Sequence, residues 1–170
     1  PVVNSFGDSI GVLEAMNKTN GDFDSNDVKV ISSFSRIVSV ALENAMTQSE
    51  LERQFNSILE VLAASIDAKD HLTAGHSLRV TEIACGIGNE LGFDQSDLDV
   101  LKVSALLHDY GKIGIDDTVL KKPGKLNNDE FIHIKTHVDK TLSILNKIHF
   151  ARKYKEVPLI AAAHHETLDG

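Results

Sequence analysis

The stretch His108-Asp109-Tyr110-Gly111 (HDYG, residues 108–111) closes a helical pattern and sets two metal-ligand-type side chains side by side. Exposed carbonyls and the helix dipole favour a cation at the C-terminal end of a helix. Asp109 can offer both carboxylate oxygens, so it is suited to bridge two metal ions. Gly111 would let the backbone turn sharply just beyond them. The stretch therefore predicts a helical fold that carries a metal centre.

Further metal-ligand-type residues occur on both sides of this stretch at intervals of about thirty residues. They are His76, His137 and the doublet His164-His165. Such intervals fit separate helices that converge on one point, as a multi-metal centre requires. Burying this many imidazoles without a common partner would cost about 1–3 kcal/mol for each unsatisfied group. A shared cation removes that cost, which favours ligands over ordinary core histidines.

Apolar periodicity predicts that the second half of the chain is made of helices and loops. The expected helices cover residues 73–91, 94–109 and 128–147, followed by a last one that begins near Val157. Gly92 is a stop signal and Asp94 a start signal. A loop of about fifteen residues is expected after Gly111. On the helix 128–147, Phe131 and Leu145 are expected to face inward.

The first part of the chain predicts a hairpin followed by a long helix. Residues 1–17 alternate in the manner of strands around a turn signal. Asp24 is a suitable N-cap, and no Gly or Pro follows until after Lys69. The apolar stripe of so long a helix needs a partner, which predicts a parallel coiled-coil connector and a homodimer. The alternative is two ordinary helices joined near Gln48.

Composition limits the classes of partner. A net charge of −8 disfavours DNA or RNA binding, and no apolar run approaches the length of a membrane span. The single Cys85 excludes a disulfide within the chain and favours a reducing compartment, hence a cytoplasmic protein. Because the chain opens at Pro1 and stops soon after the last histidines, we expect it to be a fragment.

Several stretches taken together carry a family resemblance. They are residues 108–115 (HDYGKIGI), residues 120–126 (LKKPGKL), Glu130, His137 and residues 164–170 (HHETLDG). As a set they resemble the HD-GYP subgroup of the HD metal-dependent phosphohydrolases, over roughly residues 50–170. The resemblance implies a bacterial phosphodiesterase that opens cyclic di-GMP to linear pGpG, and in some members on to GMP. The implied partner is thus a cyclic dinucleotide substrate.

The resemblance also implies roles for single residues. The implied metal ligands are His76, His108, Asp109, His137, His164 and His165. Lys112 would be the catalytic lysine beside the bridging Asp109, neutralising or protonating the leaving oxygen. Arg79 and Lys122 are candidates for contact with the substrate phosphates. His133 shares a helix face with His137, but the family pattern selects only His137.

The implied cofactors are two divalent metal ions. Iron or manganese is what the family suggests, and the histidine-rich set also admits zinc or nickel. Members with a third metal carry a Glu four residues before the first ligand histidine. Leu72 stands at that place here, so two metals are favoured over three.

The N-terminal part resembles the end of a GAF domain. The resemblance rests on residues 10–18 (IGVLEAMNK), Phe23, Asp27 and residues 41–45 (ALENA). The expected organisation is the C-terminal part of a GAF domain at 1–46, a connecting helix at 26–69 and a truncated phosphohydrolase domain at 50–170. The expected fold is mostly α: an HD-type helical bundle joined by a long helix to the hairpin and last helix of a partial α+β GAF domain.

Two other functions remain open at this point. One is an HD phosphohydrolase that acts on another nucleotide or phosphate ester. The other is a non-catalytic receptor or dimerisation module that keeps the fold without turnover. The Gly-Tyr-Pro triplet and a further Asp ligand of the family are expected beyond Gly170, so we expect the 170 residues alone to be inactive.

Overall fold

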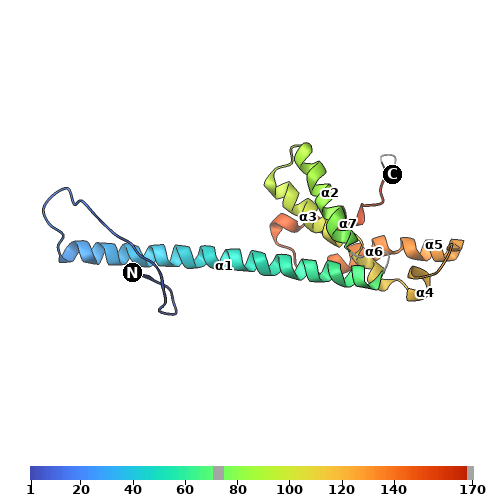
Figure 1. Cartoon of the computed structure of the whole chain (residues 1–170), viewed down its shortest axis with the longest axis horizontal. Helices are drawn as coiled ribbons and strands as arrows, with labels where there is room; N and C mark the ends of the chain where they lie inside the picture. Colours follow the sequence, from blue (N-terminus) through green and yellow to red (C-terminus); the bar gives the residue numbers. More distant parts are fainter. Residues whose placement is uncertain (71–74, 168–170) are drawn as a thin grey trace. The chain divides into compact units, whose positions relative to one another are not determined.

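The computed structural model of the protein describes residues 1–70 and 75–167. Its regular structure consists of helices and one two-stranded sheet, which confirms the expected mostly α fold. Contacts divide the chain into two compact units, Pro1–Phe55 and Asn56–Gly170. Figure 1 labels the α-helices of the chain.

The first unit begins with a short antiparallel hairpin. Its strands are β1 (Val2–Val3) and β2 (Ser9–Gly11). The turn between them is held by Asn4, whose side-chain oxygen accepts a hydrogen bond from the backbone N–H of Asp8 at 2.8 Å. The hydroxyl of Ser39 donates to the carbonyl of Val3 and ties the hairpin to the helix that follows. The hairpin expected within residues 1–17 is confirmed.

One continuous helix, α1 (Ser25–Lys69), follows the hairpin. Asp24 caps it: its carboxylate accepts from the N–H of Asp27 at 3.1 Å, and the Asp27 carboxylate accepts from the N–H of Asp24 at 2.8 Å. These reciprocal bonds satisfy donors that every helix start leaves open. The alternative of two helices joined near Gln48 is wrong. Neither α1 nor any other helix within the described ranges has the length and apolar content to cross a bilayer.

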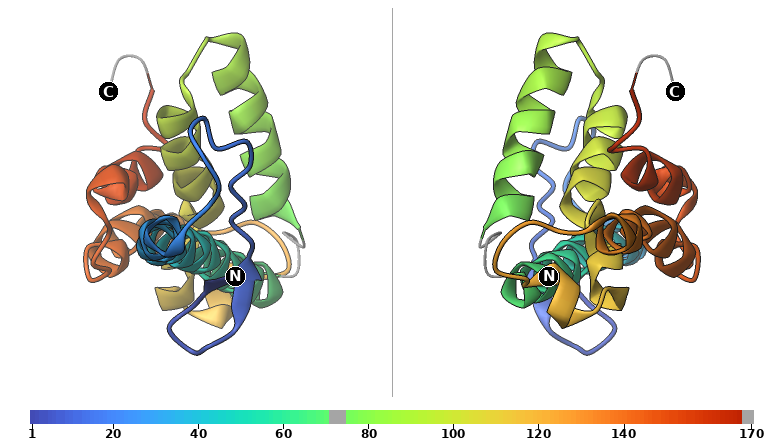
Figure 2. Two further views of the ribbon diagram at one scale, coloured as in Figure 1. Left: turned by 90° about the vertical axis from the view of Figure 1, so that its left-hand side faces the viewer. Right: turned by 90° about the vertical axis from the view of Figure 1, so that its right-hand side faces the viewer.

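The second unit begins with the last turns of α1 and continues into a helical hairpin. Its arms are α2 (His76–Glu90) and α3 (Gln95–Leu107), which lie side by side in both views of Figure 2. Gly92 takes a positive φ of 76° after α2, the conformation that glycine favours. The Asp94 side chain accepts from the N–H of Asp97 at 2.9 Å and starts α3. Both expected boundary signals are confirmed.

The segment after α3 begins with helical turns where a loop was expected, and only residues 121–127 form the loop that leads to the next helix. It contains a 3-10 helix and one helical turn, η1 (Tyr110–Gly114) and α4 (Asp117–Leu120). The prediction was wrong because a 3-10 turn needs only local bonds, here from the Lys112 N–H to the Asp109 carbonyl at 3.0 Å and from the Ile115 N–H to the Lys112 carbonyl at 3.1 Å. Ile115 is buried and anchors the end of η1.

The helix expected at 128–147 is divided into two. They are α5 (Asn128–Lys135) and α6 (His137–Leu145). At the break, the Thr136 hydroxyl donates to the carbonyl of His133 at 2.6 Å, a local bond that competes with helix continuation. Leu145 is buried as expected, but Phe131 is 52% exposed, so its predicted inward orientation was wrong.

The last elements complete the bundle around the end of α3. They are η2 (Arg152–Tyr154) and α7 (Val157–Ala162). The helix start expected near Val157 is confirmed, but α7 ends before His164, which lies in a turn. α7 packs against α3 and α6, and α6 packs against η1.

Gly111 is the point of closest approach between η1 and α6. A Cβ at this position would lie 1.9 Å from the His137 carbonyl oxygen and 2.5 Å from the Thr141 nitrogen. Moreover, the Gly111 N–H donates to the Thr141 hydroxyl at 2.8 Å. Glycine is required here because two backbones meet, and the sharp turn expected from the sequence is not the reason: φ of Gly111 is not positive.

We expect Gly111→Ala to lower the free energy of unfolding by about 2 kcal/mol or more, because the added methyl group meets backbone atoms that cannot yield cheaply. Gly86→Ala is the matched control, since nothing lies within 4 Å of its Cβ in α2. It should raise stability by up to about 1 kcal/mol. Urea unfolding followed by circular dichroism measures both, and equal effects would contradict the close-approach explanation.

Candidate metal centre

The six residues singled out in the sequence come together in two groups of three. One group is His76, His108 and Asp109, and the other is His137, His164 and His165. Within each group the nitrogen or carboxylate atoms that could bind a metal all lie within 4.8 Å of one another. Both groups therefore have the donor types and the proximity needed to hold a divalent cation.

These residues occupy the ends of helices. His76 is the first residue of α2, and His108 follows the last residue of α3. His137 is the first residue of α6, whereas His164 and His165 lie in the turn after α7. Helix ends converge on this point, where free carbonyls at the C-terminal ends of α3 and α7 favour positive charge.

Three of the histidines are oriented by the same local hydrogen bond. In each, ring Nδ1 lies 2.6–2.7 Å from the backbone carbonyl three residues earlier; the rings are those of His108, His137 and His164. A carbonyl oxygen can only accept, so Nδ1 carries the proton in each ring. The tautomer of the neutral ring is thereby assigned, and in that form Nε2 keeps the lone pair that binds metals.

Asp109 lies between the two groups and turns one oxygen toward each. Its Oδ2 is 3.2 Å from Nε2 of His108 and 4.0 Å from Nε2 of His76. Its Oδ1 is 3.4 Å from Nε2 of His137 and 3.7 Å from Nε2 of His164. A carboxylate in this position can contribute one ligand atom to each of two neighbouring cations.

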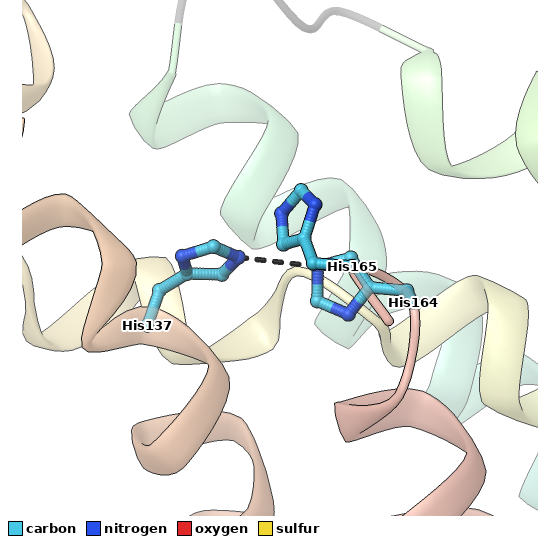
Figure 3. Close-up of side chains that lie close together, drawn as sticks. All are labelled: His137, His164 and His165. Atoms are coloured by element: carbon cyan, nitrogen blue, oxygen red, sulfur yellow. Dashed lines mark hydrogen bonds between the residues drawn. The ribbon is translucent and has the colours of Figure 1, made fainter. Parts of the chain in front are cut away.

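The contact between His137 and His164 tests whether a cation fits. Their Nε2 atoms lie 3.1 Å apart, the contact drawn in Figure 3. With both protons on Nδ1, two lone pairs face each other and repel unless a positive charge lies between them. Burial lowers the pKa of His137, and it lowers the pKa of His164 to about 4, so an added proton is disfavoured at neutral pH. The donor set thus fits a bound metal ion.

The charges within the first group are strongly coupled. Burial alone would lower the pKa of His108, but the hydrogen bond and charge of Asp109 outweigh it and the pKa is raised. Burial alone would raise the pKa of Asp109, but His108 and Lys112 hold it well below its usual range. Asp109 is therefore ionised at neutral pH, as a metal ligand must be.

Lys112 reaches the centre from η1. Its Nζ lies 2.7 Å from Oδ2 of Asp109 and 3.5 Å from Oδ2 of Asp70. Asp70 is buried next to the end of α1, and sequence reasoning missed it. A carboxylate directly after a long helix was the available signal, but its distance of about forty residues from the His-Asp pair concealed the contact.

The other candidates lie in different surroundings. Arg79 is exposed on α2, one turn after His76. Lys122 forms an ion pair with Glu130, with Nζ at 2.6 and 2.8 Å from the two carboxylate oxygens. His133 turns its Nε2 toward Asp116, at 3.5 Å from a carboxylate oxygen. Leu72, whose identity bears on a third metal, lies outside the described residues.

Comparison with known proteins identifies relatives of the chain. The sequence model of the family described as HD domain matches residues 73–170. A 3'3'-cGAMP-specific phosphodiesterase 3 of Vibrio cholerae is 39% identical over 113 residues, which cover 66% of this chain and 24% of that protein. The cyclic di-GMP phosphodiesterase response regulator RpfG of Xanthomonas campestris is 32% identical over 136 residues, covering 79% of this chain and 35% of RpfG.

A third relative comes from Thermotoga maritima. A cyclic di-GMP phosphodiesterase of Thermotoga maritima is 34% identical over 122 residues, covering 72% of this chain and 33% of that protein. The chain spans about a quarter to a third of the length of these relatives. The family match extends over more than half of the chain and contains both candidate metal groups, and the chain therefore belongs to the HD domain family.

Proposed function

We propose that the protein is a metal-dependent phosphodiesterase that hydrolyses cyclic di-GMP to pGpG or GMP in bacterial signalling. The observation that carries the proposal is the position of Asp109, with one oxygen toward each group of histidines. Two adjacent cations held in this way suit the hydrolysis of a phosphate diester. The relatives named as cyclic dinucleotide phosphodiesterases supply the substrate class.

The histidines and Asp109 would bind the metal ions, and Lys112 would act on the leaving group. His76 and His108 would hold one divalent ion and the second group of histidines the other, with Asp109 shared between them. When bound, such ions polarise the phosphate oxygens and lower the pKa of a bound water. Lys112 would donate a proton from Nζ to the departing ribose oxygen. Its ammonium, 2.7 Å from Asp109, lies close enough to the shared ligand to reach a phosphate bound there.

Two ions, of iron or manganese, are the cofactors that we propose, with zinc or nickel as alternatives. Five imidazoles and one carboxylate form a mixed nitrogen and oxygen set that all four metals accept. The described ligand groups number two, which supports two ions in preference to three.

Two cyclic dinucleotides, cyclic di-GMP and 3'3'-cGAMP, are candidate substrates, and they differ in one base. Among the relatives, some are named for cyclic di-GMP and others for 3'3'-cGAMP. Both are cyclic dinucleotides with two phosphodiester bonds, so one metal centre can serve either. Arg79 and Lys122 remain our candidates for contact with the substrate phosphates. We propose cyclic di-GMP as the main substrate, and rates measured side by side on both nucleotides would decide between them.

We further propose that the protein acts in the cytoplasm as a homodimer paired through α1, with a GAF-type sensor at its N-terminal side. Exposed apolar side chains support the pairing. Val30, Phe34, Ile37 and Leu51 are each more than half exposed. The first three are separated by steps of four and three residues, and Leu51 follows Ile37 by two heptads, which is the spacing of a coiled-coil seam. A second α1 lying along this seam would bury them.

The metal stoichiometry tests the ligand assignment. We expect about two equivalents of Mn²⁺ or Fe²⁺ per chain after equilibration and gel filtration, measured by atomic emission. His76→Ala and His165→Ala should each remove about one equivalent, because each belongs to a different group. Exposed His149 is the control, and His149→Ala should keep both ions. Full metal content in both ligand variants would contradict the assignment.

Turnover tests the activity. In the full-length gene product, we expect His108→Ala to lower the rate of cyclic di-GMP hydrolysis at least about 100-fold, because it removes a ligand and a partner of Asp109. His133→Ala is the control, since that ring faces Asp116. Product chromatography follows both. Unchanged turnover in His108→Ala would refute the metal mechanism, and binding without turnover in the unaltered protein would favour the receptor alternative.

Sedimentation tests the dimer. We expect Ile37→Asp to shift the protein toward monomer by at least about tenfold in dissociation constant, because it places a charge in the apolar seam. Met46 is a matched control: it is also exposed and follows Ile37 by about two and a half turns, so it lies on the opposite face. Met46→Asp should leave the dissociation constant unchanged, and equal effects of the two variants would exclude this seam.

A further inference from the structure

Lys69, the last residue of α1, binds the backbone of a segment more than forty positions away. Its ammonium donates to the carbonyls of Lys112 at 3.2 Å, Ile113 at 2.8 Å and Ile115 at 2.8 Å. An ammonium has three protons, so the three carbonyls use all of them. Asp117 adds a carboxylate oxygen at 3.4 Å. The Lys69 side chain is 22% exposed, which limits competition from water.

The carbonyls of Lys112 and Ile113 belong to η1, and that of Ile115 belongs to the residue directly after its last turn. The Lys112 carbonyl also accepts from the Ile115 N–H, and its second lone pair can accept from Lys69. A basic side chain is well suited to carbonyls at the end of a helix. Here the cap comes from α1, so a residue of one helix holds the end of another. A 3-10 turn has weaker bonds than an α-helix and relaxes readily when its end is released. Lys69 thus adds three hydrogen bonds at the end of η1 to the anchors that buried Ile115 and the Gly111–Thr141 bond provide.

The same end of α1 also contacts the side chain that η1 carries. Oδ2 of Asp70, the residue after Lys69, lies 3.5 Å from Nζ of Lys112, whose other acidic neighbour is Asp109 at 2.7 Å. Lys69 thus holds the backbone of Lys112 while Asp70 lies against its ammonium. The two contacts restrict where the Lys112 ammonium can lie relative to Asp109.

We infer that Lys69 is a positioning residue for the reaction: by binding the three η1 carbonyls, it fixes Lys112 where its ammonium can protonate the leaving oxygen. The inference rests on the proposed function, because that function assigns the proton donation to Lys112. Lys69 itself touches neither group of candidate metal ligands through these bonds. Its loss should therefore impair departure of the leaving group and leave metal binding intact.

The experiment compares two substrates in the full-length, Mn²⁺-loaded protein. Cyclic di-GMP has a ribose alkoxide leaving group that needs a proton, whereas bis(p-nitrophenyl) phosphate releases p-nitrophenolate, which does not. Lys69→Met should lower kcat on cyclic di-GMP about 10- to 100-fold with KM changed less than about threefold. The rate on bis(p-nitrophenyl) phosphate should fall less than about threefold, and the metal content should not change.

Control variants separate positioning from general stability. Lys153→Met removes another lysine that links two elements, through its ion pair with Asp99, and should affect neither rate. Lys112→Met should reproduce the selective loss, and combining it with Lys69→Met should add little further loss, because both act on one step. Lys69→Arg keeps the charge, but its planar fork fits three converging carbonyls poorly, so it should show a smaller loss with the same selectivity.

The outcomes distinguish the inference from the function on which it rests. If the unaltered protein does not hydrolyse cyclic di-GMP or 3'3'-cGAMP, the proposed function fails. If it does, but Lys69→Met and Lys69→Arg lower both rates equally or lower neither, Lys69 has only a structural role and the inference is overturned. If Lys69→Met does not fold, the selectivity of Lys69→Arg alone decides.

Discussion

The arrangement of the second unit depends on the groups that surround the carboxylate of Asp109. This carboxylate is a buried negative charge, and such a charge is stable only when positive or hydrogen-bonding groups surround it. Four imidazoles and the Lys112 ammonium lie within 4.0 Å of its two oxygens. Each of these groups comes from a different element or turn. The Lys112 ammonium offsets this charge directly, whereas the Nε2 lone pairs of the neutral rings face the carboxylate and call for a cation between them. For this reason α2, α3, η1, α6 and the turn after α7 meet at one point.

The position of the candidate ligands at helix ends also has a local cause. A histidine just past or just within the end of a helix can bond its Nδ1 to a carbonyl three residues earlier, and three of the rings do so. The rings are then oriented before any ion binds, which reduces the entropy lost on binding. Gly111 completes the geometry, because its missing side chain lets η1 lie against the first turn of α6 and brings His137 toward Asp109.

Sequence reasoning succeeded where the signal is local. The caps at Asp24 and Asp94 and the stop at Gly92 are short-range hydrogen-bond and backbone effects, and each occurs as expected. The six candidate ligands could be proposed because a His-Asp pair, a histidine doublet and two further histidines recur at intervals of about thirty residues. The break at Thr136 and the 3-10 turn after Asp109 were missed because small local bonds decide them. Asp70 and Lys69 were missed because only the folded chain brings them to Lys112.

The last turn of α1 contacts the segments that carry residues of the candidate metal centre. Besides Lys69 and Asp70, Asp67 accepts a hydrogen bond from the buried Ser77 hydroxyl at 2.8 Å, next to His76. One helical turn thus contacts the segments that carry Lys112 and His76.

A regulatory state can act only through contacts that differ between two states, and these few polar contacts are what a displacement of α1 would change. Each is worth about 1 kcal/mol net, or up to about 3 kcal/mol where a charge takes part, enough for the 5- to 150-fold range of ordinary allosteric coupling. Under the proposed function, a signal carried by α1 would need no rearrangement of the histidine groups, because a shift of η1 alone would move Lys112 relative to Asp109.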